Sequence, residues 1–130
     1  MAFQCVVVTP EEQTLDETVT QVILPAHDGE IGILTDRAPL LVKLGQGSLR
    51  LDLANSTRRT LYIEGGVAQM KDNRLTILTQ EAIRPEDINR ETVRAERAEA
   101  EARRTTDAKS AEDRQRRLAR ARALESLATK

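Results

Sequence analysis

Short runs of alternating apolar and polar residues dominate the first two thirds of the chain. Leu49-Arg50-Leu51-Asp52-Leu53 alternates strictly, which is the period of a half-buried β-strand, and Leu61-Tyr62-Ile63-Glu64 repeats the pattern more briefly. Two β-branched runs, Phe3 to Val8 and Val19 to Leu24, are bounded by turn-forming residues. We therefore expect residues 1–84 to form a β-sandwich or barrel of many short strands.

Turn-forming residues separate these runs. Asp72-Asn73 precedes the apolar run Leu75 to Leu78, and both residues tolerate the positive φ angles of a tight hairpin turn. Glycines lie between the expected strands or at their ends, and Gly65-Gly66 is interpreted as a turn or bulge between two strands. The pattern thus predicts a sequence of hairpins.

The composition changes abruptly in residues 85–130, which are predicted to form a separate antiparallel helical hairpin. Glycine disappears, and Ala, Glu and Arg, which are strong helix formers, take over. Pro85 and Asn89 mark the expected beginning of a first helix that runs to about Arg104.

A second helix is expected to open at Ser110, which with Asp113 resembles a capping box, and to run toward Leu127. The apolar faces of the two helices are narrow and consist mostly of alanine. The expected faces are Ala95, Ala98 and Ala102 in the first helix, and Ala111, Leu118, Ala121, Leu124 and Ala128 in the second. Such faces bury little apolar area. At roughly 25 cal/mol per Å² this burial stabilises the packed hairpin only weakly, so we expect that the hairpin can either fold back or reach out to another subunit.

The two regions differ in charge, although the whole chain has a formal net charge of only -1. Residues 1–83 carry 7 Lys/Arg and 11 Asp/Glu, whereas residues 84–130 carry 13 and 10. The basic second region is therefore suited to meeting an acidic surface. The single cysteine, Cys5, lies in an apolar run and is expected to be a buried structural thiol. No apolar run approaches the ~20 residues that cross a bilayer.

Candidate catalytic chemistry is sparse. His27 is the only histidine, and with Asp28 and Glu30 it supports a small hydrolase only as a distant alternative. The segment 28–32 lacks the regular oxygen-ligand spacing of a calcium loop, and the chain has no phosphate-binding Gly-Lys-Ser/Thr sequence. We therefore expect a non-catalytic protein without a metal site.

Five arginines form a dense cluster on the expected second helix. They are Arg114, Arg116, Arg117, Arg120 and Arg122. Aromatic residues for base stacking are absent from this region, so a solvated helix face or contact with an acidic protein surface is favoured over nucleic acid. One hypothesis is a free-standing adaptor whose sandwich and basic helices bind other proteins.

Five segments, taken in order, point to a more specific hypothesis. They are Asp28-Gly29-Glu30-Ile31-Gly32-Ile33, Ala38-Pro39-Leu40-Leu41, Gly47-Ser48-Leu49-Arg50, Tyr62-Ile63-Glu64-Gly65-Gly66-Val67 and Leu75-Thr76-Ile77-Leu78. With the Ala/Glu/Arg hairpin that follows them, they resemble the epsilon subunit of F-type ATP synthases, equivalent to the mitochondrial delta subunit. This resemblance implies a β-sandwich of about ten strands followed by a helical hairpin.

The resemblance also implies a function. The chain would be a non-catalytic central-stalk subunit of a proton-translocating ATP synthase, coupling rotation of the c ring to the catalytic head. Its sandwich would bind the gamma subunit and the c ring, with Glu30 and Arg37 at the c-ring interface. It would reach the membrane only through the complex, at the cytoplasmic face of a bacterial cell membrane.

For the helical hairpin, the resemblance implies regulation. In bacterial relatives an extended hairpin meets an acidic segment of the beta subunits in the alpha/beta head and restrains ATP hydrolysis, and the five arginines would make that contact. Some relatives bind ATP through an Ile/Leu-Asp-x-x-Arg-Ala motif. Arg94 and Ala95 match this motif here, but Glu91 replaces the aspartate and Arg90 the aliphatic residue. ATP binding is therefore expected to be absent or weak, and no other cofactor is expected.

Overall fold

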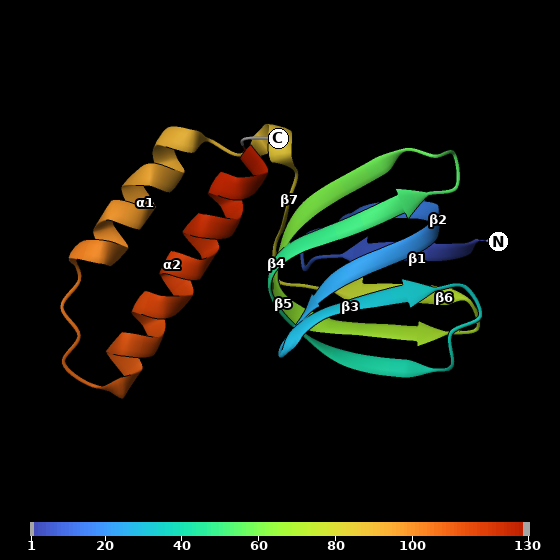
Figure 1. Cartoon of the computed structure of the whole chain (residues 1–130), viewed down its shortest axis with the longest axis horizontal. Helices are drawn as coiled ribbons and strands as arrows, with labels where there is room; N and C mark the ends of the chain where they lie inside the picture. Colours follow the sequence, from blue (N-terminus) through green and yellow to red (C-terminus); the bar gives the residue numbers. More distant parts are fainter. Residues whose placement is uncertain (1, 129–130) are drawn as a thin grey trace.

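A β domain and a helical hairpin lie side by side in the computed structural model, which describes residues 2–128 (Figure 1). We call residues 2–84 the β domain and residues 85–128 the arm. The strands are β1 (Phe3–Val8), β2 (Gln13–Ala26), β3 (Gly29–Leu34), β4 (Leu40–Leu53), β5 (Arg58–Lys71), β6 (Arg74–Leu78) and β7 (Ala82–Ile83). The arm comprises a 3-10 turn (Pro85–Asp87), α1 (Arg90–Ala102) and α2 (Ala108–Ala128). The predicted order of β structure followed by two packed helices is confirmed.

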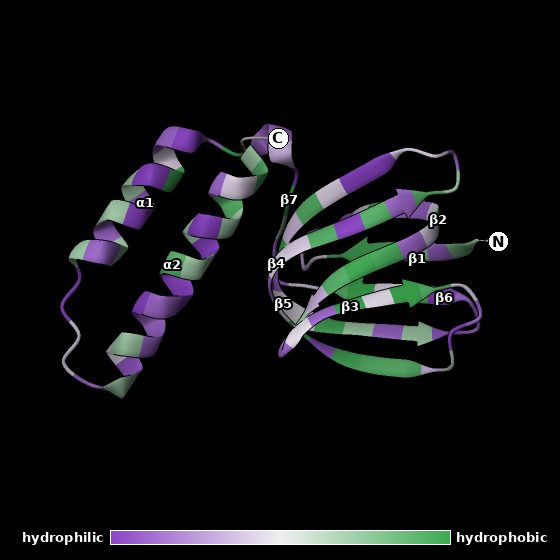
Figure 2. Ribbon diagram, in the orientation of Figure 1, coloured by the Kyte–Doolittle hydropathy of each residue, from purple (hydrophilic) through white to green (hydrophobic). Residues whose placement is uncertain are grey.

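Five strands close into a ring, which makes the β domain barrel-like. β1 pairs in parallel with β6 and antiparallel with β2, and β5 and β4 complete the circuit between them. β3 pairs with β2, and the short β7 pairs with β5, so both lie outside the ring. The ring encloses an almost entirely aliphatic core drawn from β1 to β6. In Figure 2 the hydrophobic residues appear as green segments along these strands. Leu49, Leu51 and Leu53 all point into this core, which confirms the predicted alternation.

The β domain has seven strands, fewer than the ten or so that the family resemblance implies. The difference arises because β2, β4 and β5 are each 14 residues long and span segments that the pattern divides into separate runs. β4 and β5 curve around the end of the β domain that faces α2 (Figure 1). Each of these long strands therefore takes the place of two shorter strands.

Gly65 and Gly66 lie inside β5, whose pairing with β4 has no register shift there, so the interpretation of this pair as a turn or bulge between two strands is wrong. Gly66 pairs with Leu44 of β4, and the strand continues on both sides. The two glycines have φ angles of +67° and +107°, which L-residues with side chains rarely adopt. A Cβ on Gly66 would lie 1.9 Å from the carbonyl oxygen of Leu78 in β6. The pair thus marks a bend where two backbones approach closely.

Replacing these glycines tests the close approach. We expect Gly66→Ala to lower the free energy of unfolding by about 4 kcal/mol or more, because backbone atoms rather than a flexible side chain block the new methyl group. Gly65→Ala is the control, since its Cβ meets nothing within 4 Å and costs only the ~1–2 kcal/mol of a left-handed conformation. Urea unfolding measures both values, and equal losses would contradict the prediction.

The predicted hairpin turn at Asp72-Asn73 is confirmed. Both residues have positive φ angles, +52° and +57°, between the paired residues Lys71 and Arg74. Asn73 has a second role that the pattern does not show. Its side-chain Oδ1 accepts from the backbone N–H of Asp36 at 2.8 Å, and its Nδ2 donates to the Asp36 carboxylate at 3.0 Å. This reciprocal contact ties the loop after β3 to the β5–β6 hairpin.

Cys5 is fully buried, as expected, and burial followed by the nearby charge of Asp16 raises the pKa of its thiol to about 12. We expect this thiol to resist a neutral thiol reagent in the native protein at pH 8 and to react at once in 6 M guanidinium. Reaction followed by absorbance checks this, and native labelling at the rate of a free thiol would contradict the burial.

The helix starts fit the expectation at α1 but not at α2. Asn89 caps α1, and its side chain accepts from the Thr92 N–H at 3.1 Å. Ser110 does not open α2, which begins at Ala108. Instead the Asp107 carboxylate accepts from the Ser110 N–H at 2.8 Å, and the Ser110 hydroxyl accepts from the Asp107 N–H at 3.2 Å. The negative charge of Asp107 suits the positive end of the helix, so this carboxylate is the cap and Ser110 its reciprocal partner.

The predicted apolar face of α1 is wrong. Ala95, Ala98 and Ala102 are exposed, and the buried residues are Val93 and Ala100. Val93 is the only large apolar side chain in α1, and burying it turns the three alanines toward solvent, because they lie about half a helical turn away from it.

The predicted apolar face of α2 is largely confirmed. Leu118, Ala121 and Leu124 are buried, whereas Ala111 and Ala128 are only half-buried. Leu127, expected only as the end of the helix, belongs to the buried face as well. No helix among residues 2–128 is long and apolar enough to span a membrane.

Candidate functional site

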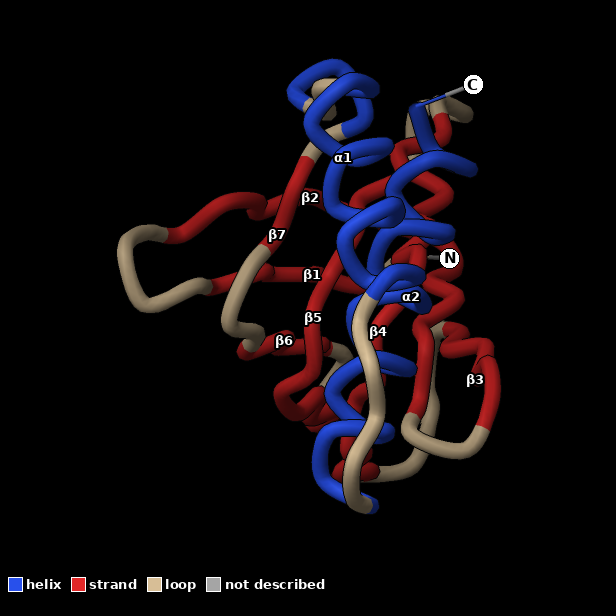
Figure 3. Tube along the Cα trace, turned by 90° about the vertical axis from the view of Figure 1, so that its left-hand side faces the viewer, coloured by secondary structure: helices blue, strands red, loops and turns tan. Residues whose placement is uncertain are grey.

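The interface between the arm and the β domain is the candidate functional site. α2 packs against β4 and β5, and α1 packs on the far side of α2 (Figures 1 and 3). The apolar part of the interface is a small cluster. Its buried members are Tyr62, Val93, Ala121, Leu124 and Leu127, with Ile83, Ile88 and Ala123 partly buried beside them. This cluster is separate from the core of the β domain, so the arm does not share that core.

Arg120 of α2 provides the polar part of the interface. Its Nη1 donates to Glu64 Oε1 at 3.0 Å and its Nη2 to Glu81 Oε1 at 2.8 Å, so one guanidinium joins two carboxylates of the β domain. The guanidinium carbon lies 5.4 Å from the centre of the Tyr62 ring, within cation–π range. Glu96 of α1 lies 3.9 Å from Arg120 Nε, which extends the cluster to the outer helix.

The β domain holds the Glu64 carboxylate and the Glu81 backbone in place without help from the arm. The Tyr62 hydroxyl and the Gln46 side-chain amide both donate to Glu64 Oε1, at 3.1 and 3.3 Å. The buried Thr79 hydroxyl accepts from the Glu64 N–H at 3.2 Å and donates to the Glu81 carbonyl at 3.3 Å. Thr79 therefore fixes the backbone of both acidic residues, and the site is preorganised.

Glu64, Tyr62 and Arg120 shift one another's pKa values. Partial burial by itself would raise the pKa of Glu64, but the charge and hydrogen bond of Arg120, with the bonds from Tyr62 and Gln46, lower it below its ordinary value. Burial would likewise lower the pKa of Arg120, yet its bonds and charges with Glu81 and Glu64 raise it. Burial and the charge of Glu64 raise the pKa of Tyr62, so its hydroxyl stays a donor. Glu64 and Arg120 therefore stay charged and Tyr62 stays protonated at neutral pH, as the contact needs.

Three of the five clustered arginines, unlike Arg120, bond only to partners within the arm. Arg116 and Arg117 donate to the Asp113 carboxylate at 2.7 and 2.9 Å, and these bonds lower the pKa of Asp113 to about 2. Arg114 donates to the backbone carbonyl of Glu101 at 3.3 Å, which links the two helices. The five arginines therefore do not form one free basic surface in this conformation.

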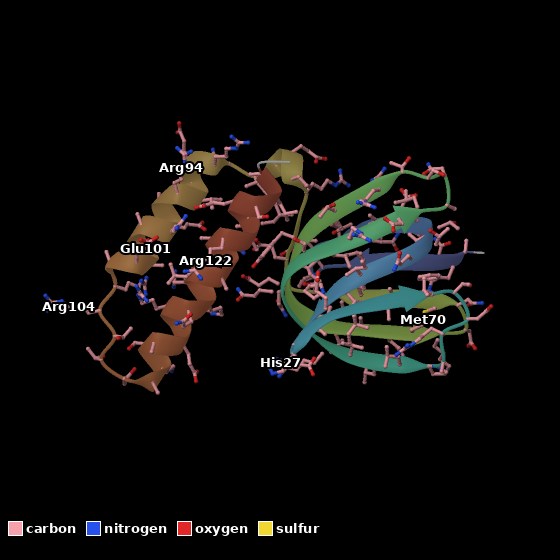
Figure 4. All side chains as sticks on the ribbon, viewed as in Figure 1. His27, Met70, Arg94, Glu101, Arg104 and Arg122 are labelled. Carbon is pink, nitrogen blue, oxygen red and sulfur yellow. The ribbon has the colours of Figure 1, made fainter. Side chains whose placement is uncertain are left out.

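Arg122 differs from the other four arginines. It is exposed on α2, and the structure gives it no partner among residues 2–128 (Figure 4). Arg120 is the opposite case, with a side chain only 23% exposed. The acidic partners of Arg120 were not singled out from the sequence. The sequence feature that could have identified Glu64 is its position as a single charged residue directly after a run of three apolar residues, which are buried in the strand.

The structure does not bring Glu30 and Arg37 together. Both are exposed, but Glu30 lies at the start of β3, beside the turn with His27 that Figure 4 labels. Arg37 lies in the loop beyond the other end of β3, and about 13 Å of strand separates Glu30 from Leu34 alone. His27 and Asp28 are exposed as well, and no three His, Cys, Asp or Glu side chains converge as a metal site within the described residues.

The three residues of the degenerate ATP motif do not line a nucleotide-sized pocket. Glu91, Arg94 and Ala95 are all exposed on α1. The cavity beside this helix measures about 170 Å³ and is lined by Val93 and Arg120 among others. Sites for small-molecule ligands generally enclose ~300 Å³ or more.

We expect the isolated chain to show no sub-millimolar affinity for ATP. The reason is that the motif residues are exposed and the neighbouring cavity is too small. Isothermal titration of ATP into the chain checks this. Arg94→Ala is the control, because heat that survives this substitution does not come from the motif. Sub-millimolar binding that Arg94→Ala abolishes would contradict the prediction.

Comparison with known proteins connects this architecture to a family. The family model described as ATP synthase, Delta/Epsilon chain, beta-sandwich domain matches residues 2–85. The ATP synthase epsilon chain of Rhodopirellula baltica is 43% identical over 83 residues, which are 64% of each chain. That of Nostoc punctiforme is 38% identical over 97 residues, 74% of this chain and 71% of the relative. That of Dichelobacter nodosus is 32% identical over 99 residues, 76% of this chain and 69% of the relative.

Two solved assemblies share the fold. A chain of the mitochondrial ATP synthase of Euglena gracilis (OSCP/F1/c-ring) superposes with a TM-score of 0.86, at 23% identity, over 96% of this chain and 80% of its own length. A chain of the central stalk/c-ring of the Tetrahymena thermophila mitochondrial ATP synthase superposes with a TM-score of 0.68, at 15% identity. The superposition covers 96% of this chain and 95% of that chain. These likenesses cover the arm as well as the β domain. The family model and the sequence relatives carry one conclusion: the chain belongs to the delta/epsilon chain family of ATP synthase.

Proposed function

We propose that this chain is a central-stalk subunit that couples rotation of the c ring to the catalytic head and regulates ATP hydrolysis through its arm. It is a non-catalytic subunit of an ATP synthase complex. The observation that carries the regulatory part is the division of the structure into two separate apolar clusters. Because the arm contributes nothing to the core of the β domain, it can leave without unfolding that domain.

An exposed apolar face of the β domain supports docking of a gamma subunit. Leu41, Val67 and Leu78 are 71%, 39% and 47% exposed, although large apolar side chains are normally covered. Val67 and Leu78 are paired neighbours in β5 and β6 and line a groove of about 740 Å³ that also includes Lys43. We assign the gamma subunit to this groove, because a permanent partner would remove its apolar surface from water.

The c ring is assigned to the exposed residues at the two ends of β3. Glu30 and Arg37 offer opposite charges on an edge strand and its following loop, and both are open to polar loops of a partner. Since the epsilon-chain relatives above are bacterial, we place the complex at the cytoplasmic face of a bacterial cell membrane.

In the extended state, we propose that the arm contacts an acidic segment of the beta subunits in the alpha/beta head. The five clustered arginines are the contact residues, because guanidinium groups bind carboxylates with charge-assisted hydrogen bonds. The structure has the arm folded against the β domain, where Arg122 alone among the five lacks a partner within the described residues. The folded arm is thus the non-inhibiting state.

Deleting residues 85–130 from the reconstituted complex separates the two parts of the proposal. We expect ATP hydrolysis to rise severalfold, because the inhibiting contact is lost, and the remaining β domain still to co-purify with gamma. Steady-state ATPase rates and affinity purification measure the two effects. Unchanged hydrolysis would refute regulation by the arm, and failure to co-purify would refute docking through the β domain.

A further inference from the structure

We propose that Arg120 is a latch residue that exchanges partners. In the folded arm it binds Glu64 and Glu81, and in the extended arm the same guanidinium binds the acidic partner surface. The two states therefore compete for one side chain. This inference rests on the proposed function, and it assigns regulation of the arm to a specific contact rather than to the whole interface.

The first argument is that Arg120 alone links the charges of the arm and the β domain. Among residues 2–128, every ion pair that crosses this interface comes from its guanidinium. The other arm ion pairs stay within the arm, as between Arg97 and Glu125 at 3.0 Å or Arg103 and Asp113 at 3.4 Å. Detaching the arm therefore breaks the Arg120 contacts and leaves those pairs intact.

The second argument is that the apolar cluster between the arm and the β domain is small. Ala121, Leu124 and Leu127 are the buried side chains that α2 contributes to this cluster, and one of the three is only a methyl group. By contrast, the Arg120 contact combines two charge-assisted hydrogen bonds with a cation–π contact to Tyr62. Removing either partner leaves a half-buried charge uncompensated, which costs more than the loss of the same pair in water.

The third argument is that the two acidic residues form a ready site for a guanidinium. Tyr62, Gln46 and Thr79 hold Glu64 and the Glu81 backbone from within the β domain. When the arm leaves, these bonds hold the Glu64 carboxylate and the Glu81 backbone in place, so the site stays ready to recapture Arg120. An acidic partner surface must therefore outcompete a preorganised site, which sets a threshold for extension of the arm.

The exchange has a consequence that a purely structural contact would not have. Replacing the carboxylates frees Arg120 for the partner, whereas replacing Arg120 removes it from both states. Both changes release the arm from the β domain. Replacing the carboxylates is expected to strengthen inhibition of hydrolysis, whereas replacing Arg120 is expected to weaken it.

Arm position in the isolated full-length chain gives the first test. Spin labels at His27→Cys and Lys109→Cys, both exposed positions, report the distance between the arm and the β domain, while the buried Cys5 stays unlabelled. We expect Glu64→Gln/Glu81→Gln and, separately, Arg120→Ala to raise the ratio of extended to folded arm by at least about tenfold. Glu99→Gln is the matched control, because it removes an ion pair with Arg103 that lies entirely within the arm. Protection of Cys5 from a thiol reagent shows that each variant keeps its β domain folded.

Salt gives a second reading of the same samples. Raising the ionic strength from 0.1 M to 1 M shortens the screening length from about 10 Å to about 3 Å and is expected to extend the wild-type arm partially. The double carboxylate variant is expected to respond less. An unchanged distance distribution in both latch variants would overturn the latch, while leaving regulation by the arm untouched.

Hydrolysis by the reconstituted complex gives the third test. We expect Glu64→Gln/Glu81→Gln to lower the ATPase rate severalfold and Arg120→Ala to leave it equal to or above wild type. If both variants extend the arm and both lower the rate equally, Arg120 does not bind the partner and the exchange is refuted. If the arm extends and deletion of the whole arm also leaves the rate unchanged, the proposed function fails instead.

Discussion

The close approach of β5 to the end of β6 at Gly66 is the constraint on which the rest of the structure depends. It puts a bend in β5, with Tyr62 and Glu64 at the arm interface just before the glycine pair and the residues from Val67 onward paired with β6. Thr79 and Glu81 follow within three residues of Leu78. This backbone contact thus brings both acidic residues of the latch to the same surface, while the pairing of β1 with β2 and β6 closes the ring.

This arrangement explains why the arm can be both specifically placed and removable. A large apolar interface would hold the arm permanently, and an interface of solvated charges would not define its position. The structure uses a small apolar cluster for contact and one guanidinium with fixed carboxylates for position. Because ion pairs specify geometry better than they stabilise, the arm has a defined folded position at modest cost to release.

The parts of the fold that the sequence predicts are those governed by local rules. Strict alternation marks Leu49 to Leu53 because one side of that strand is buried, and Asp72-Asn73 predicts its turn because few residues tolerate positive φ. The phase of α1 escaped prediction because Val93, one residue, outweighs three alanines. The contact of Arg120 with Glu64 escaped because it joins residues 56 positions apart, and nothing local distinguishes Arg120 from its four neighbours.

The opposite charges of the two regions acquire a structural meaning from the same contact. The arm is basic and the β domain is acidic, so the two attract each other. In the folded state, within residues 2–128, the only ion pairs across their interface are those of Arg120. Asp113 pairs with Arg116 and Arg117 inside α2, and these pairs do not depend on contact with the β domain. An extended arm regains one strong cation at Arg120, next to the free Arg122. The state of this single residue therefore decides how much positive charge the arm presents to a partner.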